Sequence, residues 1–199
     1  MKIKYLSAVL FLAFASSSYA EVRLWVSDDS NDGNFGGREG VDAFCNADEE
    51  KPAIADSTTR AFISVNETDE IRDMPTNYNI PTNEVIFGYD GTTQIADNFT
   101  ALLNASVTPL TNPISLNSFA RQVWTGSNSI GAVDTYTCEN WTAATGFGGK
   151  NGQSDSATGV AIAASTQGCD NGFKTYCITY TPPAPATVRG SASPLKSWE

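Results

Sequence analysis

Four oxygen-bearing side chains near the N-terminal end of the chain have the spacing of a calcium loop. Counted from Asp28, the loop places Asp28, Ser30 and Asp32 at positions one, three and five. Gly33 then stands at position six and Glu39 at position twelve, as in an EF-hand loop. Calcium takes about six to eight oxygen ligands, which this stretch could supply. The same acids also fit a solvated rim, because an acid such as Glu39 in the first turn of a helix offsets the helix dipole.

The cysteines and the absence of histidine limit the other kinds of site that the chain could form. All four cysteines lie beyond residue 40, at Cys45, Cys138, Cys169 and Cys177. In an exported chain they predict two disulfides, and four cysteines allow three pairings. Zinc is disfavoured because the chain has no His and no Cys-x-x-Cys.

Catalysis finds little support in the residue types. No His can serve as a base, and no Gly-x-Ser-x-Gly elbow is present. Asp134 and Glu139 could act as a glycosidase pair, but nothing in the sequence fixes their separation. We therefore expect no enzyme. Asn140 and Trp141 are candidates to face a ligand, although Trp141 and Trp124 fit a core beside a disulfide at least as well.

The ends of the chain predict export. Residues 1–20 read as a cleaved signal peptide, with two lysines, a short apolar run and small residues before the cut. Residues 21–180 form one domain, and the Pro/Ser-rich stretch 181–199 is a flexible tail. Without the signal peptide, the chain has 10 basic and 22 acidic residues, which gives a net charge of −12. This charge disfavours nucleic acids and anionic membranes, and no later segment is apolar enough for membrane insertion. The expected location is secreted, periplasmic or at the cell surface.

Short elements must position these residues. Residues 22–26 predict a strand, 27–37 a loop, 38–50 an amphipathic helix and 60–65 a second strand. Residues 67–74 predict a short helix before Pro75, and 77–118 predict loops and short strands with a turn at Asp90-Gly91. Further on, 121–126, 160–164 and 173–180 predict strands, and 144–159 a surface loop.

Several stretches together resemble a known family. "GGREGVDAFC", "TRAFISV", "VWTGSN", "YTCENW" and "CDNGFKTYC" resemble, in this order, the endostatin domain of basement-membrane collagens. "YDGTTQI", "PLTNPIS" and "ENWTAATG" look like motifs of its bacterial relatives, the leptospiral endostatin-like proteins and their domain of unknown function. The resemblance covers about residues 22–180.

The resemblance implies a fold and a disulfide pairing. The expected fold is α+β and C-type-lectin-like, with a mixed, mostly antiparallel sheet, an N-terminal helix and long loops. The implied bridges are nested and join Cys45 to Cys177 and Cys138 to Cys169. In the chain-entropy model, loss of the outer bridge should cost on the order of 4 kcal/mol.

The resemblance also implies a function, with clear departures. Endostatin binds zinc through histidines and heparin through arginines, and a chain without His and with few Arg carries neither activity over. The leptospiral relatives are regarded as surface proteins that bind matrix and plasma components. We therefore expect a non-catalytic extracellular adhesion module that binds a protein or glycan. The alternative is a calcium-dependent carbohydrate-binding protein. The sequence leaves the ligand and the oligomeric state open.

Overall fold

One mixed sheet organises the chain. The computed structural model describes residues 20–115, 121–146 and 148–183. The strands are β1 (Val22–Val26), β2 (Thr58–Ala61), β3 (Ile86–Phe87), β4 (Gln94–Ala96), β5 (Gln122–Trp124), β6 (Gly148–Gln153), β7 (Ser165–Gly168) and β8 (Lys174–Tyr180). Their order is β4-β3-β1-β8-β5-β6-β7, and β2 also pairs with β8. The β1–β3 and β5–β8 pairs are parallel and the others antiparallel, so the expected mixed, mostly antiparallel sheet is confirmed.

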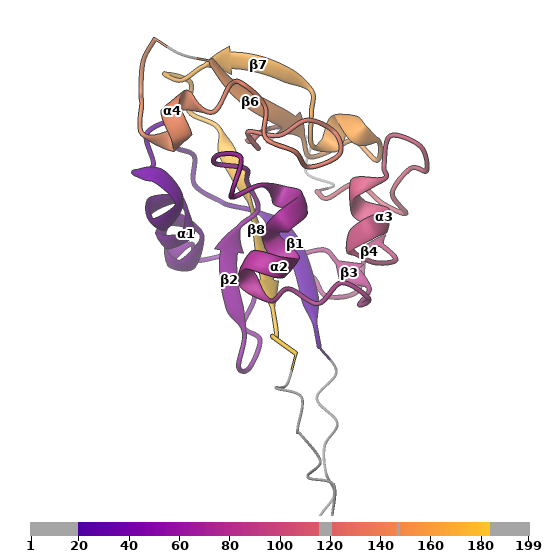
Figure 1. Cartoon of the computed structure of the whole chain (residues 1–199). Coiled ribbons are helices and arrows are strands. Elements are labelled where there is room, and N and C mark those ends of the chain that lie inside the picture. Colours follow the sequence, from indigo (N-terminus) through magenta and orange to yellow (C-terminus); the bar gives the residue numbers. More distant parts are fainter. Residues whose placement is uncertain (1–19, 116–120, 147, 184–199) are drawn as a thin grey trace, which may run out of the picture.

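The helices are few and short. They are α1 (Gly37–Ala47), η1 (Ile71–Asp73), α2 (Met74–Tyr78), α3 (Phe99–Leu103), α4 (Cys138–Trp141) and η2 (Gly159–Ala161), where η marks a 3-10 turn. Figure 1 shows α1 and α3 at opposite sides of the molecule, with β1, β8 and β2 between them. The molecule is thus α+β, as the sequence predicts.

Strand β8 lies at the centre because both of its faces are apolar. Successive side chains of a strand point to opposite faces. Tyr176, Ile178 and Tyr180 join a large cluster with Val22, Phe62 and residues of η1, α2 and α3. Cys177 joins a second cluster with Trp25, Val41, Trp124 and Trp141. Each face of one strand therefore anchors a separate core.

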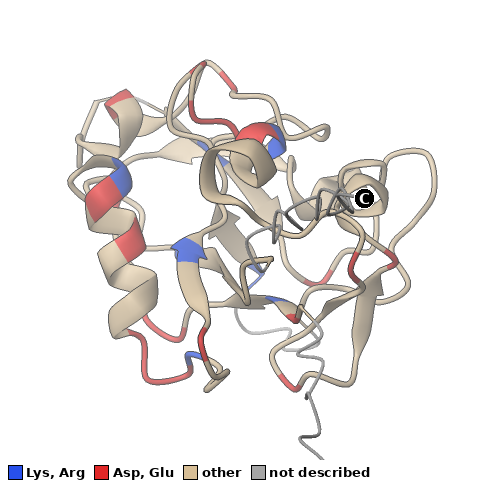
Figure 2. Ribbon diagram, turned by 60° about the horizontal axis from the view of Figure 1, so that its bottom comes forward, with Lys and Arg blue, Asp and Glu red and all other residues tan. Residues whose placement is uncertain are grey.

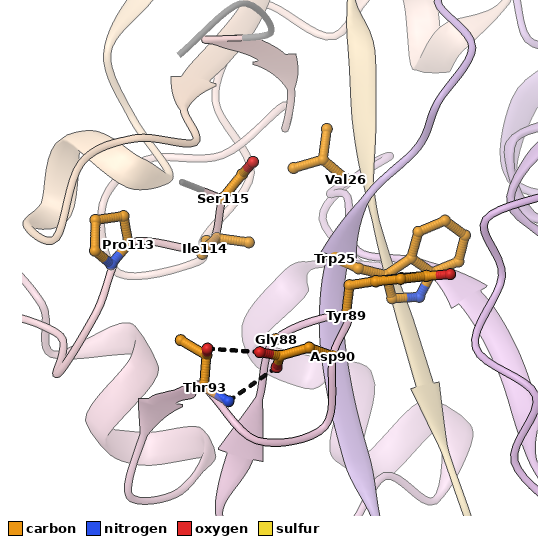
Figure 3. A pocket seen from close by; sticks show the side chains of 9 residues that line it. All are labelled: Trp25, Val26, Gly88, Tyr89, Asp90, Thr93, Pro113, Ile114 and Ser115. Atoms are coloured by element: carbon orange, nitrogen blue, oxygen red, sulfur yellow. Dashed lines mark hydrogen bonds between the residues drawn. The ribbon is translucent and has the colours of Figure 1, made fainter. Parts of the chain in front are cut away.

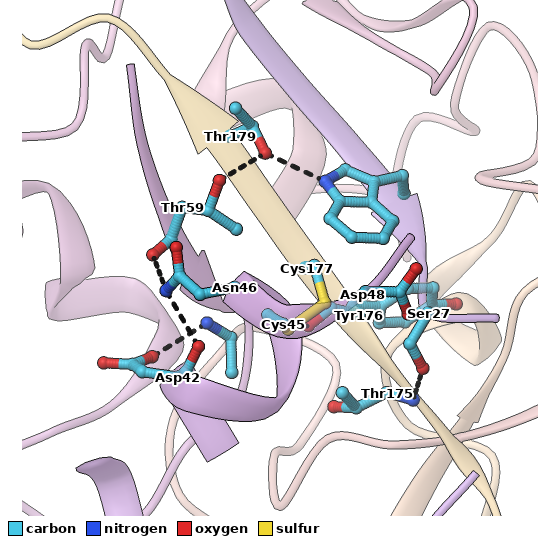
Figure 4. The surroundings of a disulfide bond; sticks show 12 residues. Ser27, Asp42, Cys45, Asn46, Asp48, Thr59, Thr175, Tyr176, Cys177 and Thr179 are labelled. Atoms are coloured by element: carbon cyan, nitrogen blue, oxygen red, sulfur yellow. Dashed lines mark hydrogen bonds between the residues drawn. A yellow bond between two sulfur atoms is a disulfide. The ribbon is translucent and has the colours of Figure 1, made fainter. Parts of the chain in front are cut away.

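Helix α1 is tied to the sheet by a disulfide and by ion pairs. Cys45 and Cys177 are bonded, and both are fully buried (Figure 4). The Arg38 guanidinium donates from Nε and Nη2 to the two carboxylate oxygens of Asp69, at 2.7 and 2.9 Å. The Asp42 carboxylate accepts the Ala61 N–H at 2.8 Å. We call α1, β2 and β8, with these contacts, the stapled corner.

The second disulfide joins Cys138 to Cys169, so both bridges expected from the resemblance are confirmed. All four cysteines are thus paired, which is typical of a chain that folds in an extracellular or periplasmic environment. No helix in the described part of the chain is both long and apolar enough to cross a membrane. The predicted signal peptide and most of the predicted tail lie outside the described residues.

Several predicted elements are wrong in place or type. The helix predicted over 38–50 ends at Ala47. The strand predicted over 60–65 corresponds to β2, which begins two residues earlier and ends four residues earlier. Residues 160–164 hold the 3-10 turn η2 instead of a strand. The loop predicted over 144–159 contains β6, whose Gly149 lies too close to the Trp124 ring for a side chain.

Two helix predictions also fail for local reasons. The helix predicted over 67–74 begins only at Ile71, as η1. It does not stop before Pro75, because Pro is tolerated in the first turn of α2. Residues 77–118 were expected to lack helices but contain α3, where the Asn98 side chain caps the Ala101 N–H at 2.8 Å.

Candidate functional site

A groove opens beside β1 where its partner strand stops. Strand β3 pairs with β1 only at Val22 and Arg23, and the chain then turns away at Gly88. Segment 113–115 forms the opposite wall (Figure 3). The groove has a volume of about 290 Å³ and is lined by Trp25, Val26, Gly88, Tyr89, Asp90, Thr93, Pro113, Ile114 and Ser115. We call it the β1 groove.

A rigid turn supplies the acidic side of the groove. The Asp90 carboxylate accepts four hydrogen bonds: Oδ1 from the N–H groups of Thr92 and Thr93, at 2.9 and 2.8 Å, and Oδ2 from their hydroxyls, at 2.9 and 2.7 Å. These hydrogen bonds hold the pKa of Asp90 well below its ordinary value, and the bond from the Thr93 N–H contributes most. Gly91 completes the turn at a φ of 69°, which favours glycine. The groove therefore keeps a fixed negative charge.

An aromatic ring stands at the rim of the groove. Tyr89 is 49% exposed, although it is a large side chain next to a sheet. Its backbone is held in place, because its carbonyl accepts the Arg23 Nη1 at 3.0 Å. The negative charge of Glu50 raises the pKa of the Tyr89 hydroxyl. An exposed ring on a fixed backbone is suited to stacking against a ligand.

The remaining walls are mostly apolar and come from two parts of the chain. Trp25 is almost fully buried, and its indole Nε1 donates to the Thr179 hydroxyl at 3.0 Å. Pro113 and buried Ile114 line the groove together with Val26, on the opposite side of β1 from the Trp25 indole (Figure 3). Ligand pockets commonly combine apolar walls with a few fixed polar groups. The β1 groove has this composition.

The residues of the calcium hypothesis lie apart from the groove and do not converge. Asp28 pairs with Lys174, Nζ to Oδ1, at 3.2 Å, and its side chain is 71% exposed. Asp32 Oδ1 accepts the Asn34 N–H at 2.8 Å, and Glu39 lies in the first turn of α1. Ser30 is exposed. Within the described residues, no three His, Cys, Asp or Glu side chains gather as a metal site.

The path of this loop explains why the spacing misleads. An EF-hand loop coils around its ion, whereas this loop runs beside other segments. Asn31 forms a bridge with Phe173 and Asn34 with Thr142, and the Gly33 N–H donates to the Cys169 carbonyl at 2.7 Å. These contacts hold the loop against the second disulfide, so its carboxylates point to different surroundings.

Asn140 and Trp141 lie in an unusual turn. Cys138, Glu139, Asn140 and Trp141 all have φ between 49° and 65°, so α4 is one left-handed turn. Each such residue costs roughly 1–2 kcal/mol, and the surrounding contacts must hold it. The disulfide at Cys138 provides one of these contacts.

Trp141, one of the candidates to face a ligand, lies in the core. The residue is fully buried, and its indole donates to the Ser64 carbonyl at 2.8 Å. It packs against Trp124 with ring centroids 5.6 Å apart. Asn140 is exposed. Only Asn140 in this stretch is of a type that favours the left-handed region, so the residue types do not predict a left-handed turn over four residues.

Comparison with known families decides the classification. The sequence profile of a family described as "Protein of unknown function (DUF1554)" matches residues 28–159. The chain belongs to this family. No curated protein matches the chain. The DUF1554 match confirms the predicted domain of unknown function.

The match also spans two walls of the β1 groove. Residues 88–93 and 113–115 fall inside the matched DUF1554 region, whereas Trp25 and Val26 precede it. The sequence predicts the turn at Asp90-Gly91 but no binding site there. The available signals were the turn dipeptide and the neighbouring Tyr89.

Proposed function

We propose that this chain is an exported, non-catalytic binding module of endostatin-like, C-type-lectin-like fold whose β1 groove recognises a protein partner. The observation that carries the proposal is the groove itself, with exposed Tyr89 and ionised Asp90 beside a strand whose neighbour stops short. The nested disulfide pairing supports the fold assignment, since the resemblance implied it. The oxidised cysteines and the predicted signal peptide support export.

The chemistry of the groove supports binding without catalysis. Asp90 is the only carboxylate among the lining residues, whereas glycoside hydrolysis uses a pair of carboxyl groups. Its oxygens already accept four hydrogen bonds, so it is poorly placed to take up a proton. None of the four cysteines is a free thiol.

The charge of the molecule favours a basic partner. The sequence has 22 acidic and 12 basic residues, and Figure 2 shows acidic positions in many parts of the ribbon. A strongly acidic surface speeds encounters with basic proteins and repels polyanions. Heparin-like glycans are therefore poor candidates, and a protein with a basic surface is a good one.

The test is a binding screen with matched tyrosine variants. The domain is screened against arrayed extracellular-matrix proteins, plasma proteins and glycans, with calcium and again with chelator. We expect saturable, calcium-independent binding to a protein that Tyr89→Ala weakens about tenfold or more. Tyr136→Ala is the control, because Tyr136 is equally exposed, at 48% against 49% for Tyr89, but does not line the groove.

The outcomes separate the candidate functions. Equal binding by the two variants would remove the β1 groove from the proposal, and the absence of any saturable protein ligand would overturn it. Glycan binding that needs calcium would favour the carbohydrate-binding alternative. Calorimetry with calcium provides a second check, since a native-state ligand must raise the melting temperature.

A further inference from the structure

Over the last residues of β1, the described strands pair with only one of its two edges. The Ser27 N–H donates to the Thr175 carbonyl at 2.9 Å, and the Thr181 N–H donates to the Glu21 carbonyl at 3.0 Å. In an antiparallel pair, hydrogen-bonded positions alternate along the strand. The odd-numbered residues of β1 therefore bond to β8, and Val22, Leu24 and Val26 turn their N–H and C=O groups to the other edge.

An independent contact supports this alternation. Val26 lies opposite Tyr176 in the β1–β8 register. The Tyr176 carbonyl, however, accepts the Phe62 N–H at 2.8 Å. Phe62 directly follows β2, which flanks β8 on the side away from β1. The Val26–Tyr176 pair is thus a non-hydrogen-bonded pair.

The free edge of β1 borders the groove. On this side β3 pairs only with Val22 and Arg23, and within the described residues no other strand pairs with β1 beyond that point. Val26 itself lines the groove (Figure 3). Its backbone N–H and C=O therefore face the cavity, where a ligand can reach them.

We propose that the β1 groove takes an extended peptide segment of a partner protein, which pairs with the backbone of Val26 as an added strand and places a lysine or arginine beside Tyr89 and Asp90. This inference rests on the proposed function and names its ligand. Strand addition is a common mode of peptide recognition, in which main-chain hydrogen bonds give affinity and side-chain pockets give selectivity.

The side chains of the groove favour a basic residue in that segment. Successive side chains of an added strand point to opposite faces, so only alternate residues reach the rim. There they meet the exposed Tyr89 ring, whose face attracts a cation. Asp90 adds a fixed negative charge, and Glu50 lies close to the Tyr89 hydroxyl. Arg23 is the nearby cation, and it is paired with Glu21.

The decisive experiment compares two substitutions at Val26. Val26→Pro removes the N–H that faces the groove, and a proline is tolerated on a strand edge whose N–H has no ladder partner. Val26→Ala removes most of the same side chain but keeps the N–H. The probe is an acetylated six-residue peptide, Lys-Thr-Val-Thr-Lys-Thr, and its counterpart has Glu in place of each Lys. Binding is measured by amide chemical shifts of the isotope-labelled domain.

We expect the lysine peptide to shift the Val26 and Tyr89 amide signals and the glutamate peptide to bind at least about tenfold more weakly. Val26→Pro should weaken binding of the lysine peptide about tenfold relative to Val26→Ala. Equal affinities of the two variants, or equal affinities of the two peptides, would overturn the inference.

Two further measurements keep the inference separate from folding and from the proposed function. If Val26→Pro melts far below Val26→Ala, the unaltered domain is instead titrated with lysine peptides N-methylated at single positions. Strand pairing then requires that methylation weakens binding at alternate positions only, and uniform weakening would contradict it. A protein partner that Tyr89→Ala disrupts but Val26→Pro does not would preserve the proposed function and refute strand addition.

Discussion

The stapled corner and the β1 groove lie on either side of the same strand pair, yet they use their polar groups in opposite ways. In the stapled corner, Arg38 satisfies Asp69 and also donates to the carbonyls of Ala61 and Ile63, at 2.9 and 2.6 Å. Across the β1–β8 pair, no strand in the described part of the chain pairs with the outer edge of the last residues of β1. The difference indicates which region stabilises the fold and which is available to a ligand.

The contrast makes a quantitative claim about stability. Substitutions in the stapled corner should lower the free energy of unfolding by several kcal/mol without a direct effect on the groove. Substitutions in the groove should leave stability almost unchanged and alter binding. Each prediction below tests one side of this claim.

Removal of the outer disulfide should have the largest effect. Cys45 and Cys177 are 132 residues apart, so their bridge stabilises the fold by about 5 kcal/mol in the chain-entropy model. The Cys45→Ala, Cys177→Ala double variant should therefore unfold at much lower urea concentration. The control is the Cys138→Ala, Cys169→Ala variant, with a separation of 31 residues and an expected loss of about 3.5–4 kcal/mol. A smaller loss for the outer bridge would contradict the entropic account.

Among the single substitutions, Arg38→Lys should have the largest effect on stability. Lysine keeps the charge but cannot reproduce the two parallel bonds to Asp69 or reach both backbone carbonyls. Arg38 and Asp69 are only 14% and 13% exposed, so the loss should be about 2–3 kcal/mol by urea unfolding. Glu39→Gln, on the exposed side of the same helix, should change stability by less than about 0.5 kcal/mol.

Three tyrosines near the stapled corner should make the free energy of unfolding fall at high pH. Burial raises the pKa of Tyr78 to about 12, and burial also raises the pKa values of Tyr176 and Tyr180. In the unfolded chain a tyrosine ionises near pH ~10. The unfolded state therefore loses protons first, and stability should fall as pH rises from about 10 through 12.

Tyr78→Phe isolates one of these groups. The variant loses the hydrogen bond from the Tyr78 hydroxyl to Asp69, at 2.9 Å, which should cost about 1 kcal/mol at neutral pH. It keeps the ring under Arg60, whose guanidinium carbon lies 4.4 Å from the ring centroid. Urea unfolding at pH 9 to 12 should show a shallower alkaline loss than in the unaltered protein. An identical loss would assign the effect to Tyr176 and Tyr180.

The two regions also differ in how far the sequence predicted them. The strands β1 and β8 follow from their β-branched and aromatic residues, and the helix α1 follows from the spacing of Val41 and Cys45. The left-handed turn α4 and the strand β6 do not follow, because tertiary contacts fix them. Position 149 in β6, for instance, is occupied by glycine because Trp124 and the Cys138 sulfur leave no room for a side chain.

The groove could not be predicted because it depends on where a strand ends. The Asp90-Gly91 turn is visible in the sequence, but the length of β3 and the position of segment 113–115 are not. For a related reason, the structure does not bring the residues of the calcium hypothesis together. Spacing along the chain of Asp28 and Asp32 fixes their order, whereas contacts with Phe173 and Cys169 fix the path of the loop.

Asp90→Asn should have the smallest effect on stability and a clear effect on the groove. The folded state holds the pKa of Asp90 below its unfolded value, so its contribution is present above about pH 4 and is lost as pH falls further. The gap in melting temperature between the unaltered protein and Asp90→Asn should therefore be small at pH 7 and should narrow toward pH 2.5. Glu49→Gln, at an exposed site outside the groove, controls for general loss of negative charge.

The same variant tests the contrast between the two regions directly. Asp90→Asn removes the fixed charge of the groove, so the lysine peptide should bind the variant several-fold more weakly. The affinity for this peptide should also depend more steeply on salt concentration in the unaltered protein than in the variant. Glu49→Gln should change neither quantity by as much. If Asp90→Asn instead destabilised the fold as strongly as Arg38→Lys and left peptide binding unchanged, the β1 groove would be structural in the same sense as the stapled corner.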